Sequence, residues 1–220
     1  MEINGIKIDY LGHSGFLFSF GNKRVIVDPF EVHAMEKADL VLITHSHYDH
    51  CSIKDIRKVV KPGSMIIVPA DAQSKIAKVQ DINMQVMEPG DEIVFGKIKI
   101  RAIPAYNIGK DSHPKKNGWM GYVILYGTTV IYHAGDTDRI TEMQNLAGYG
   151  KVGNTFICLL PVSGKYVMDY YEAAEAAAGL NVALAIPMHY GSIVGTLEDA
   201  KSFVQECEKK GVKAVVLEKK

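Results

Sequence analysis

The feature that most constrains the fold is a plan of secondary structure that occurs twice along the chain. Each half begins with short strand-like stretches and continues with strands separated by helical segments. In the first half, strands are predicted over 6–10, 15–20, 24–30, 39–44 and 64–69, and helices over 52–60 and 71–79. In the second half, strands are predicted over 83–88, 92–95, 97–105, 155–161, 182–191 and 212–218, a hairpin over 121–135 folded at Gly127, and helices over 138–148, 168–180 and 196–211. We therefore expect an α/β (α+β) fold, an αββα sandwich of two mixed β-sheets with helices on the outer faces.

Composition narrows the class of protein and its surroundings. The 220 residues contain no low-complexity linker, so a single domain over residues 1–220 is expected. Lys+Arg and Asp+Glu are both 25, and this balance predicts no nucleic-acid partner. The chain has no signal-peptide pattern and no apolar run of about 18 residues, which predicts a cytoplasmic protein without a membrane partner. The three cysteines are widely separated, as is typical of reduced thiols.

Polar residues follow several of the apolar strands directly. They are Asp28, residues 45–50, Tyr106 with Asn107, Asp136 and His189. Reacting groups tend to gather on the loops that leave one edge of a sheet. A shared site is expected if these loops lie at the same edge.

The densest group is "HSHYDH", in which His45, His47, Asp49 and His50 follow the form H-x-H-x-D-H. Imidazole and carboxylate groups are suitable ligands for zinc, iron or manganese. In a tight turn, two of these donors can bind one ion and two a neighbouring ion about 3.5–4 Å away. The alternative is a polar loop that caps the helix beginning after Ser52. We refer to residues 45–50 as the 45–50 motif.

The 45–50 motif resembles that of the metallo-β-lactamase superfamily. Further matches are Asp28 in "IVDPF", Asp136 in "AGDTD" and His189 in "PMHYG". "LGHSGF", with His13, and "PMHYG" look like the lactonase-like branch, which includes L-ascorbate-6-phosphate lactonase and relatives of N-acyl-phosphatidylethanolamine phospholipase D. The family fold is also αββα, so the resemblance implies a metallo-β-lactamase-like hydrolase domain over nearly the whole chain.

The resemblance also implies roles for individual residues. His45 and His47 would hold a first metal ion, Asp49, His50 and His189 a second, and Asp136 would bridge both. Asp28 would orient ligands, Asp49 would accept the proton of the nucleophile, and His13 would act beside them. We thus expect two divalent ions, zinc first, with manganese or iron as alternatives.

One position departs from the family pattern. The third motif of the family supplies a histidine to the first ion, but here the aligned residue is Asn107. His113, six residues later, is the alternative, and a weak or vacant first site is a third possibility. An amide oxygen ligand would favour a hard ion such as manganese.

The loop that follows Asn107 suggests a substrate class. Lys110, Lys115 and His113 would bind a small anionic substrate beneath an electropositive lid, although a solvated charged loop is the simpler explanation. Tyr166 and Met168 follow another strand and would also line the pocket.

The sequence thus predicts a metal-dependent hydrolase in which a metal-bound hydroxide attacks an ester, lactone or phosphoester. A ribonuclease or phosphodiesterase of the same fold is the alternative, and a metal-binding or ligand-sensing protein with little turnover is the alternative of another class. A homo-oligomer remains open.

Overall fold

The computed structural model describes residues 1–33, 35–151 and 153–220. The chain divides into two compact units, which we describe separately. The first contains Met1–Glu88 and Leu217–Lys220, and the second contains Pro89–Val216. The single domain expected from the sequence stays a prediction.

The first unit is built on a seven-stranded mixed sheet in the order β1-β2-β3-β4-β5-β6-β7. Its strands are β1 (Glu2–Ile3), β2 (Ile6–Gly12), β3 (Gly15–Phe20), β4 (Lys23–Val27), β5 (Leu40–Leu42), β6 (Met65–Val68) and β7 (Asn83–Val86). The pairs from β1 to β4 are antiparallel, and those from β4 to β7 are parallel.

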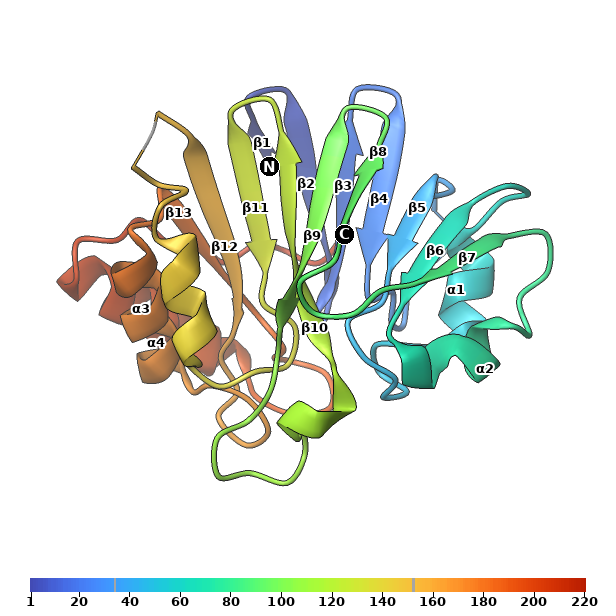
Figure 1. Ribbon diagram of the computed structural model, residues 1–220. Helices are drawn as coiled ribbons and strands as arrows, with labels where there is room; N and C mark the ends of the chain where they lie inside the picture. Colours follow the sequence, from blue (N-terminus) through green and yellow to red (C-terminus); the bar gives the residue numbers. More distant parts are fainter. Residues whose placement is uncertain (34, 152) are drawn as a thin grey trace. The chain divides into compact units, whose positions relative to one another are not determined.

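Helices follow β5 and β6 in the first unit and lie beside that end of the sheet (Figure 1). α1 (Ile53–Val59) begins where the Ser52 side chain accepts from the Asp55 N–H, and its Ile56 and Val59 are buried. These two residues belong to a hydrophobic core that includes Val41 and Ile66 of the sheet, so burial holds the helix in place. The second helical segment is short, a 3₁₀ turn η1 (Ala70–Ala72) followed by α2 (Gln73–Ile76).

The second unit contains a six-stranded mixed sheet in the order β13-β12-β11-β10-β9-β8. Its strands are β8 (Glu92–Phe95), β9 (Ile98–Pro104), β10 (Met120–Tyr126), β11 (Thr129–His133), β12 (Thr155–Pro161) and β13 (Leu184–Met188). The pairs from β8 to β11 are antiparallel, and those from β11 to β13 are parallel. Each unit therefore has antiparallel strands followed by parallel ones.

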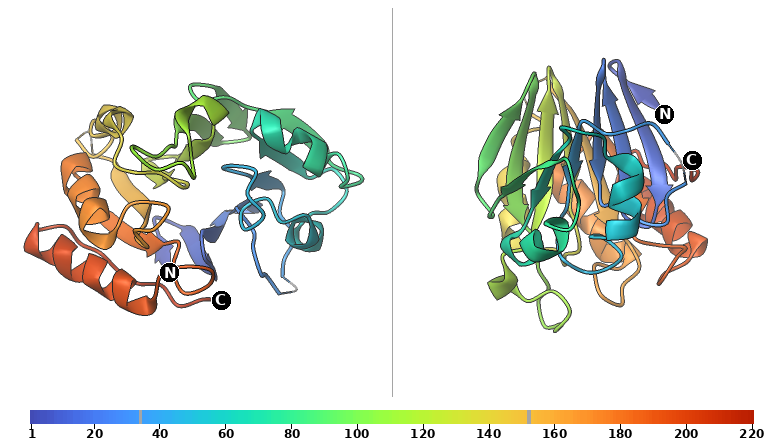
Figure 2. Two further views of the ribbon diagram at one scale, coloured as in Figure 1. Left: turned by 90° about the horizontal axis from the view of Figure 1, so that it is seen from below. Right: turned by 90° about the vertical axis from the view of Figure 1, so that its right-hand side faces the viewer.

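The helices of the second unit are α3 (Tyr170–Leu180) and α4 (Leu197–Lys209), with 3₁₀ segments η2 (Lys115–Asn117) and η3 (Thr141–Leu146). A capping box fixes the start of each long helix, at Asp169 with Glu172 and at Thr196 with Asp199. α4 buries Ala200, Phe203 and Cys207, which lie on one face. The two helices run side by side next to β12 and β13 (Figures 1 and 2).

The strand directions bring the polar loops of each unit to one edge of its sheet. β2 runs in the same direction as β4, β5 and β6, because two antiparallel steps separate β2 from β4. The loops after β2, β4 and β5, which carry His13, Asp28 and the 45–50 motif, therefore leave the same edge. By the same reasoning, β9 runs with β11, β12 and β13, so the loops with Asn107, Asp136 and His189 leave one edge of the second sheet.

The predicted α+β class with two mixed sheets and flanking helices is confirmed, with local corrections. Residues 212–218 were expected to form a strand but make only isolated bridges, Ala185 with Ala214 and, just beyond, Tyr10 with Lys219. The segment divides its pairing between β13 and β2, so no continuous ladder forms. The helices predicted over 71–79 and 138–148 shorten to α2 and to η3. Within the described ranges, no helix has both the length and the apolar character needed to cross a membrane.

Candidate functional site

The 45–50 motif is a tight turn that begins three residues after the end of β5. The N–H groups of His50 and Cys51 both donate to the His47 carbonyl, at 3.2 and 2.8 Å. His45 and His50 are buried, whereas Tyr48 between them is 66% exposed. The turn thus directs the donor residues inward and the intervening tyrosine outward.

Asp28, directly after β4, is a fully buried acceptor that organises this turn. Its carboxylate accepts from the Thr44 N–H at 2.8 Å, the Thr44 hydroxyl at 2.6 Å and His50 Nδ1 at 2.8 Å. An ionised carboxylate only accepts, so His50 Nδ1 carries a proton and the neutral ring has its lone pair on Nε2. The structure therefore places Asp28 as an orienting residue for His50.

The same carboxylate fixes His45 through Thr44. The Thr44 hydroxyl has one proton, which it donates to Asp28, so its oxygen accepts from His45 Nδ1 at 3.0 Å. His45 Nε2 is then the unprotonated nitrogen, and it lies 3.0 Å from His47 Nδ1. Two nitrogens bound to one tetrahedral zinc ion at about 2.0–2.1 Å would lie roughly 3.3 Å apart, close to this separation.

Asp49 and His13 complete the donor set of the first unit. Asp49 Oδ2 lies 3.0 Å from His13 Nε2 and 3.6 Å from His50 Nε2. His13, in the turn between β2 and β3, therefore lies next to the carboxylate of the 45–50 motif.

The second unit gathers its predicted donors around Asp136, in the loop after β11. Asp136 Oδ2 lies 3.2 Å from His113 Nε2 and 3.0 Å from His189 Nε2. All three side chains are buried. Residues separated by 23 and 53 positions in the chain thus meet at one carboxylate.

His189, directly after β13, is oriented by a serine that the sequence analysis missed. Ser163 Oγ lies 2.9 Å from His189 Nδ1. A Cβ at Gly195 would lie 2.7 Å from the Ser163 Cβ, so this close approach requires glycine. The sequence does contain one signal for Ser163. It lies just after a buried strand, β12, and the other polar site residues also lie just after buried strands.

The structure distinguishes between the two candidates for the third motif. Both the His113 N–H and His113 Nδ1 point at Asn107 Oδ1, at 3.0 and 2.9 Å. His113 Nε2, not the amide of Asn107, lies next to Asp136. The amide oxygen of Asn107 is therefore taken up by hydrogen bonds with His113, which is the candidate ligand.

The lysines proposed for substrate binding are paired with carboxylates. Lys110 Nζ lies 2.7 Å from Asp138 Oδ1, and Lys115 Nζ lies 2.7 Å from Glu142 Oε1. The hydrogen bond from Lys115, opposed by desolvation and assisted by the Tyr106 hydroxyl, lowers the pKa of Glu142 to about 2. These ion pairs reduce the positive potential of the loop.

The two remaining substrate-binding candidates differ in exposure. Tyr166 is partly exposed, and its carbonyl accepts from Asn107 Nδ2 at 2.8 Å. Met168 is fully buried, so its side chain contributes to the interior of the second unit. We therefore do not propose direct contact between Met168 and a substrate.

Three predicted site residues have left-handed backbone conformations, with φ of 54° at His13, 44° at Asp28 and 60° at His189. Residues other than glycine rarely adopt the left-handed region, and the resulting strain costs on the order of 1–3 kcal/mol per residue. It persists where the surroundings hold the side chain in place, as the hydrogen bonds of Asp28 do.

The cysteines are poor candidates for reactive groups. All three are buried and free of disulfides. Burial raises the pKa of the Cys51 thiol to about 11 and that of Cys207 to about 12, and it also raises that of Cys158. Each is therefore a protonated thiol at neutral pH, as the reduced state expected from the sequence requires.

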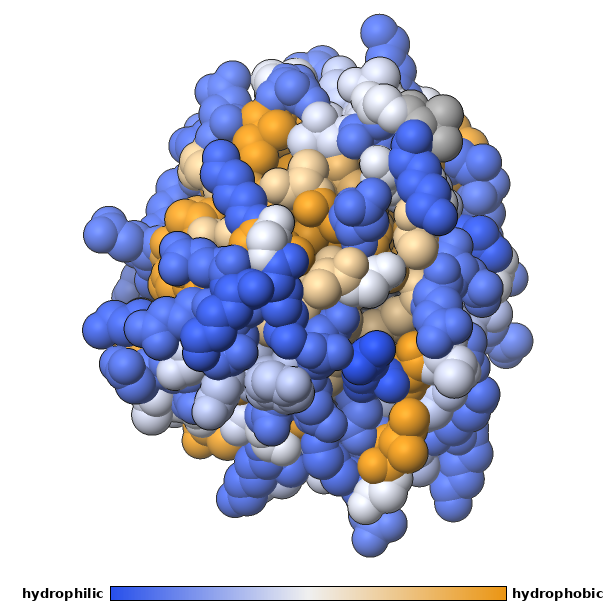
Figure 3. All heavy atoms as spheres, turned by 90° about the vertical axis from the view of Figure 1, so that its left-hand side faces the viewer, coloured by the Kyte–Doolittle hydropathy of each residue, from blue (hydrophilic) through white to orange (hydrophobic). Residues whose placement is uncertain are grey.

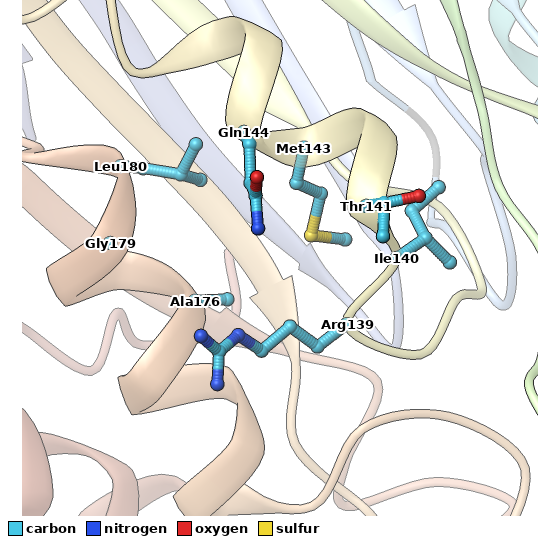
Figure 4. A pocket seen from close by; sticks show the side chains of 8 residues that line it. All are labelled: Arg139, Ile140, Thr141, Met143, Gln144, Ala176, Gly179 and Leu180. Carbon is cyan, nitrogen blue, oxygen red and sulfur yellow. The ribbon is translucent and has the colours of Figure 1, made fainter.

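The second unit also has a hollow of about 410 Å³ between η3 and α3 (Figure 4). Buried Ile140, Met143 and Leu180 form its apolar wall, and Arg139 and Gln144 lie at its rim. On this side of the unit, hydrophilic side chains surround an area where hydrophobic ones reach the surface (Figure 3). None of its lining residues is a site residue predicted from the sequence.

The donor residues fit divalent metal ions. A ligating histidine usually donates its second ring N–H to a protein acceptor, which leaves the other nitrogen for the metal. The Nδ1 atoms of His45, His50 and His113 face protein oxygens in this way. Within the first unit, donor atoms of Asp28, His45 and His50 also lie close enough together to be a candidate metal cluster.

Comparisons with known proteins agree with this chemistry. Residues 7–189 match the model of the β-lactamase superfamily domain. A UPF0173 metal-dependent hydrolase of Thermoplasma acidophilum is 35% identical over 198 residues, covering 86% of this chain and 85% of the relative. One from Nanoarchaeum equitans is 32% identical over 220 residues, with 97% of each chain covered.

A solved structure extends the likeness to three dimensions. Igni18, a metallo hydrolase from Ignicoccus hospitalis, superposes with a TM-score of 0.77 at 25% identity, covering 97% of this chain and 95% of that one. The family model and the two relatives cover most of the chain, as does this structure. The chain therefore belongs to the β-lactamase superfamily and, within it, to the UPF0173 family of metal-dependent hydrolases.

Proposed function

We propose that this protein hydrolyses an ester, lactone or phosphoester in a small anionic compound, using two divalent metal ions, zinc first. The observation that carries the proposal is the fixed orientation of the candidate ligands. Protein oxygens face the Nδ1 atoms of His45, His50 and His113, so each ring offers Nε2 as a metal donor.

Each unit supplies its own candidate ligands. In the first unit they are His45, His47, Asp49 and His50, and in the second they are His113, Asp136 and His189. When bound, such ions lower the pKa of a water ligand to near neutrality, which supplies a hydroxide nucleophile, and polarise a carbonyl or phosphoryl oxygen.

The side chains of the protein would handle protons and orientation. Asp49 would accept the proton of the nucleophile, and His13, 3.0 Å from Asp49 Oδ2, would hold that oxygen in place. Asp28 would keep His45 and His50 in their metal-binding tautomers through the hydrogen bonds described above. Asn107 takes no part as a ligand in this proposal, because its oxygen is engaged by His113.

The preference for an anionic substrate is proposed from the lysine-rich loop. Lys110 and Lys115 are paired with Asp138 and Glu142, but Lys116 of the same loop is exposed. Tyr166 would contact the substrate from the loop after β12. Matched anionic and neutral esters of similar size would measure this preference directly.

The test combines metal analysis with a panel of hydrolase substrates. Protein purified without added metal is expected to contain divalent ions and to cleave at least one ester, lactone or phosphodiester. The double variant His45→Ala/His47→Ala is expected to lose bound metal and at least about 10³-fold in activity, because a metal-generated nucleophile contributes several kcal/mol. Tyr48→Phe is the matched control, since this exposed residue lies inside the same motif and supplies no predicted ligand.

Each rival function has its own outcome in this test. Metal binding without turnover on the whole panel would support a binding or sensing protein and overturn the hydrolase. Activity on RNA that exceeds activity on small esters would support the ribonuclease alternative. A double variant that matches the wild type in metal content and activity would overturn the assignment of the ligands.

A further inference from the structure

The side chain of Asn107 occupies the position where the family pattern calls for a ligand. We propose that Asn107 is a positioning residue, which fixes the ring orientation and tautomer of His113 and is itself anchored by the ion pair between Asp138 and Lys110. The inference deepens the proposed function and rests on it for the role of His113 as a ligand.

The orientation of the Asn107 amide follows from its partners. Asn107 Nδ2 lies 3.1 Å from Asp138 Oδ1 and 2.8 Å from the Tyr166 carbonyl oxygen. Both partners can only accept hydrogen bonds, so the NH₂ group must face them and the amide oxygen must face the other way. The side chain is buried, and a flipped amide would set its oxygen against two acceptors.

The amide oxygen in turn determines the tautomer of His113. Asn107 Oδ1 accepts from the His113 N–H at 3.0 Å and lies 2.9 Å from His113 Nδ1. The second atom near Nδ1 is the Tyr166 carbonyl oxygen, at 3.1 Å. Because both of these oxygens are acceptors, they hold a proton on Nδ1. Nε2, which lies 3.2 Å from Asp136 Oδ2, is then the nitrogen that would face a metal ion.

An ion pair holds the other end of Asn107. The Asp138 carboxylate accepts from Asn107 Nδ2, from the Ile108 N–H at 2.8 Å and from Lys110 Nζ at 2.7 Å. Lys110 Nζ also donates to the Val167 carbonyl at 2.8 Å. Lys110 therefore balances the charge of a buried aspartate, and the network links the loops that follow β9, β11 and β12.

This arrangement gives Lys110 a different role from that predicted from the sequence. Its ammonium group is engaged by a carboxylate and a carbonyl of the second unit. We therefore assign Lys110 to the support of Asn107, through Asp138, in place of direct contact with substrate.

The first experiment reads the tautomer in metal-free wild-type protein. Two-bond ¹H–¹⁵N correlation spectra of histidine-labelled protein distinguish a ring protonated at Nδ1 from one protonated at Nε2, and His113→Gln assigns the resonance. His113 is expected to carry a proton on Nδ1, whether or not the Asp136 carboxylate also holds one on Nε2. A ring protonated at Nε2 alone would overturn the inference without any need for an Asn107 variant.

The second experiment breaks the network. Asn107→Leu removes both the acceptor that faces His113 and the donor that faces Asp138. It is expected to leave a mixture of His113 tautomers and to weaken zinc binding by about tenfold or more, measured by competition with a chelator.

Asn117→Leu, an exposed asparagine in the same loop, is the matched control and should change neither readout. Unchanged tautomer and zinc affinity in Asn107→Leu would overturn the positioning role. The tautomer is measured without metal, so its result is independent of the proposed function. That proposal fails separately if wild-type protein neither binds metal nor hydrolyses any substrate of the panel.

Discussion

The two units hold their donor residues in different ways. In the first unit, four predicted ligands fall within six consecutive residues, and one buried carboxylate, Asp28, orients two of them. In the second unit, the three predicted ligands come from separate loops, and the histidines have separate partners, Asn107 for His113 and Ser163 for His189. A compact motif can share one support, whereas dispersed ligands each need their own.

The largest effect is expected when Asp28, the carboxylate that orients both His45 and His50, is substituted. Asp28→Asn replaces an acceptor of three hydrogen bonds with a group that can accept fewer, leaving buried donors of Thr44 or His50 unsatisfied. We expect a loss of about 3 kcal/mol in the free energy of unfolding of the metal-free protein, because each unsatisfied buried donor costs about 1–3 kcal/mol. Urea denaturation would measure it, and metal analysis should show that the variant no longer retains its ions.

Asp71→Asn is the control for that experiment. Asp71 also lies in the first unit and accepts from the exposed Ser46 hydroxyl at 2.6 Å. Its substitution should change the free energy of unfolding by less than about 0.5 kcal/mol, as for most surface positions. An Asp28→Asn variant as stable and as metal-rich as Asp71→Asn would show that the motif does not depend on a shared carboxylate.

A smaller effect is expected when one separate support of the second unit is removed. Ser163→Ala takes away the oxygen that orients His189 while leaving Asn107 and His113 intact. Zinc affinity should fall by about tenfold, and the free energy of unfolding should change by no more than about 1 kcal/mol. Chelator competition measures the first quantity and urea denaturation the second, with Ser202→Ala on α4 as control. Damage as large as that from Asp28→Asn would remove the proposed distinction between the units.

The smallest effect concerns the surface ion pair between Lys115 and Glu142, which holds the loop after Asn107 in the second unit. The pKa of Glu142, about 2 in the folded protein, lies below its ordinary value near 4.5, so the link to Lys115 stabilises the protein above about pH 4.5. This contribution is lost as the pH falls from about 4.5 through about 2. Glu142→Gln should therefore lower the free energy of unfolding, measured by urea denaturation at pH 5.5, by less than about 1 kcal/mol, and by a smaller amount at pH 3.

Glu198→Gln provides the comparison for this pH effect, because Glu198 is an exposed acid at the start of α4. The quantity to compare is the difference from wild type at each pH, since other carboxylates also titrate in this range. A Glu142→Gln variant whose difference from wild type is the same at pH 5.5 and pH 3 would contradict the assigned pKa shift.

Local patterns in the sequence predicted most of the fold. The hairpin folded at Gly127 forms as β10 and β11, and Asp169 and Thr196 cap the helices that follow them. The strand expected over 212–218 fails for a reason that no local pattern contains. Its partners are distant residues of β13 and β2, and each supplies only an isolated bridge.

The candidate site also has one part that local sequence patterns predict and one part that they do not. The spacing within the 45–50 motif is visible in the sequence because its donors are neighbours in the chain. The role of Asn107 is not, since it depends on Asp138 and Tyr166, which lie 31 and 59 residues further along. Thr44 and Ser163 were missed for a related reason, because a hydroxyl becomes informative only once its hydrogen-bond partner is known.

The left-handed conformations of His13, Asp28 and His189 have a consequence for laboratory evolution. Glycine adopts such conformations without a steric penalty, so glycine in place of His13 or His189 would relieve backbone strain. At Asp28 the loss of three buried hydrogen bonds would outweigh that relief. Selection for heat resistance alone would then push positions 13 and 189 toward glycine, while selection for turnover would retain their side chains. Two separate libraries, one screened for heat resistance and one for turnover of a substrate from the panel, should therefore show opposite preferences at positions 13 and 189.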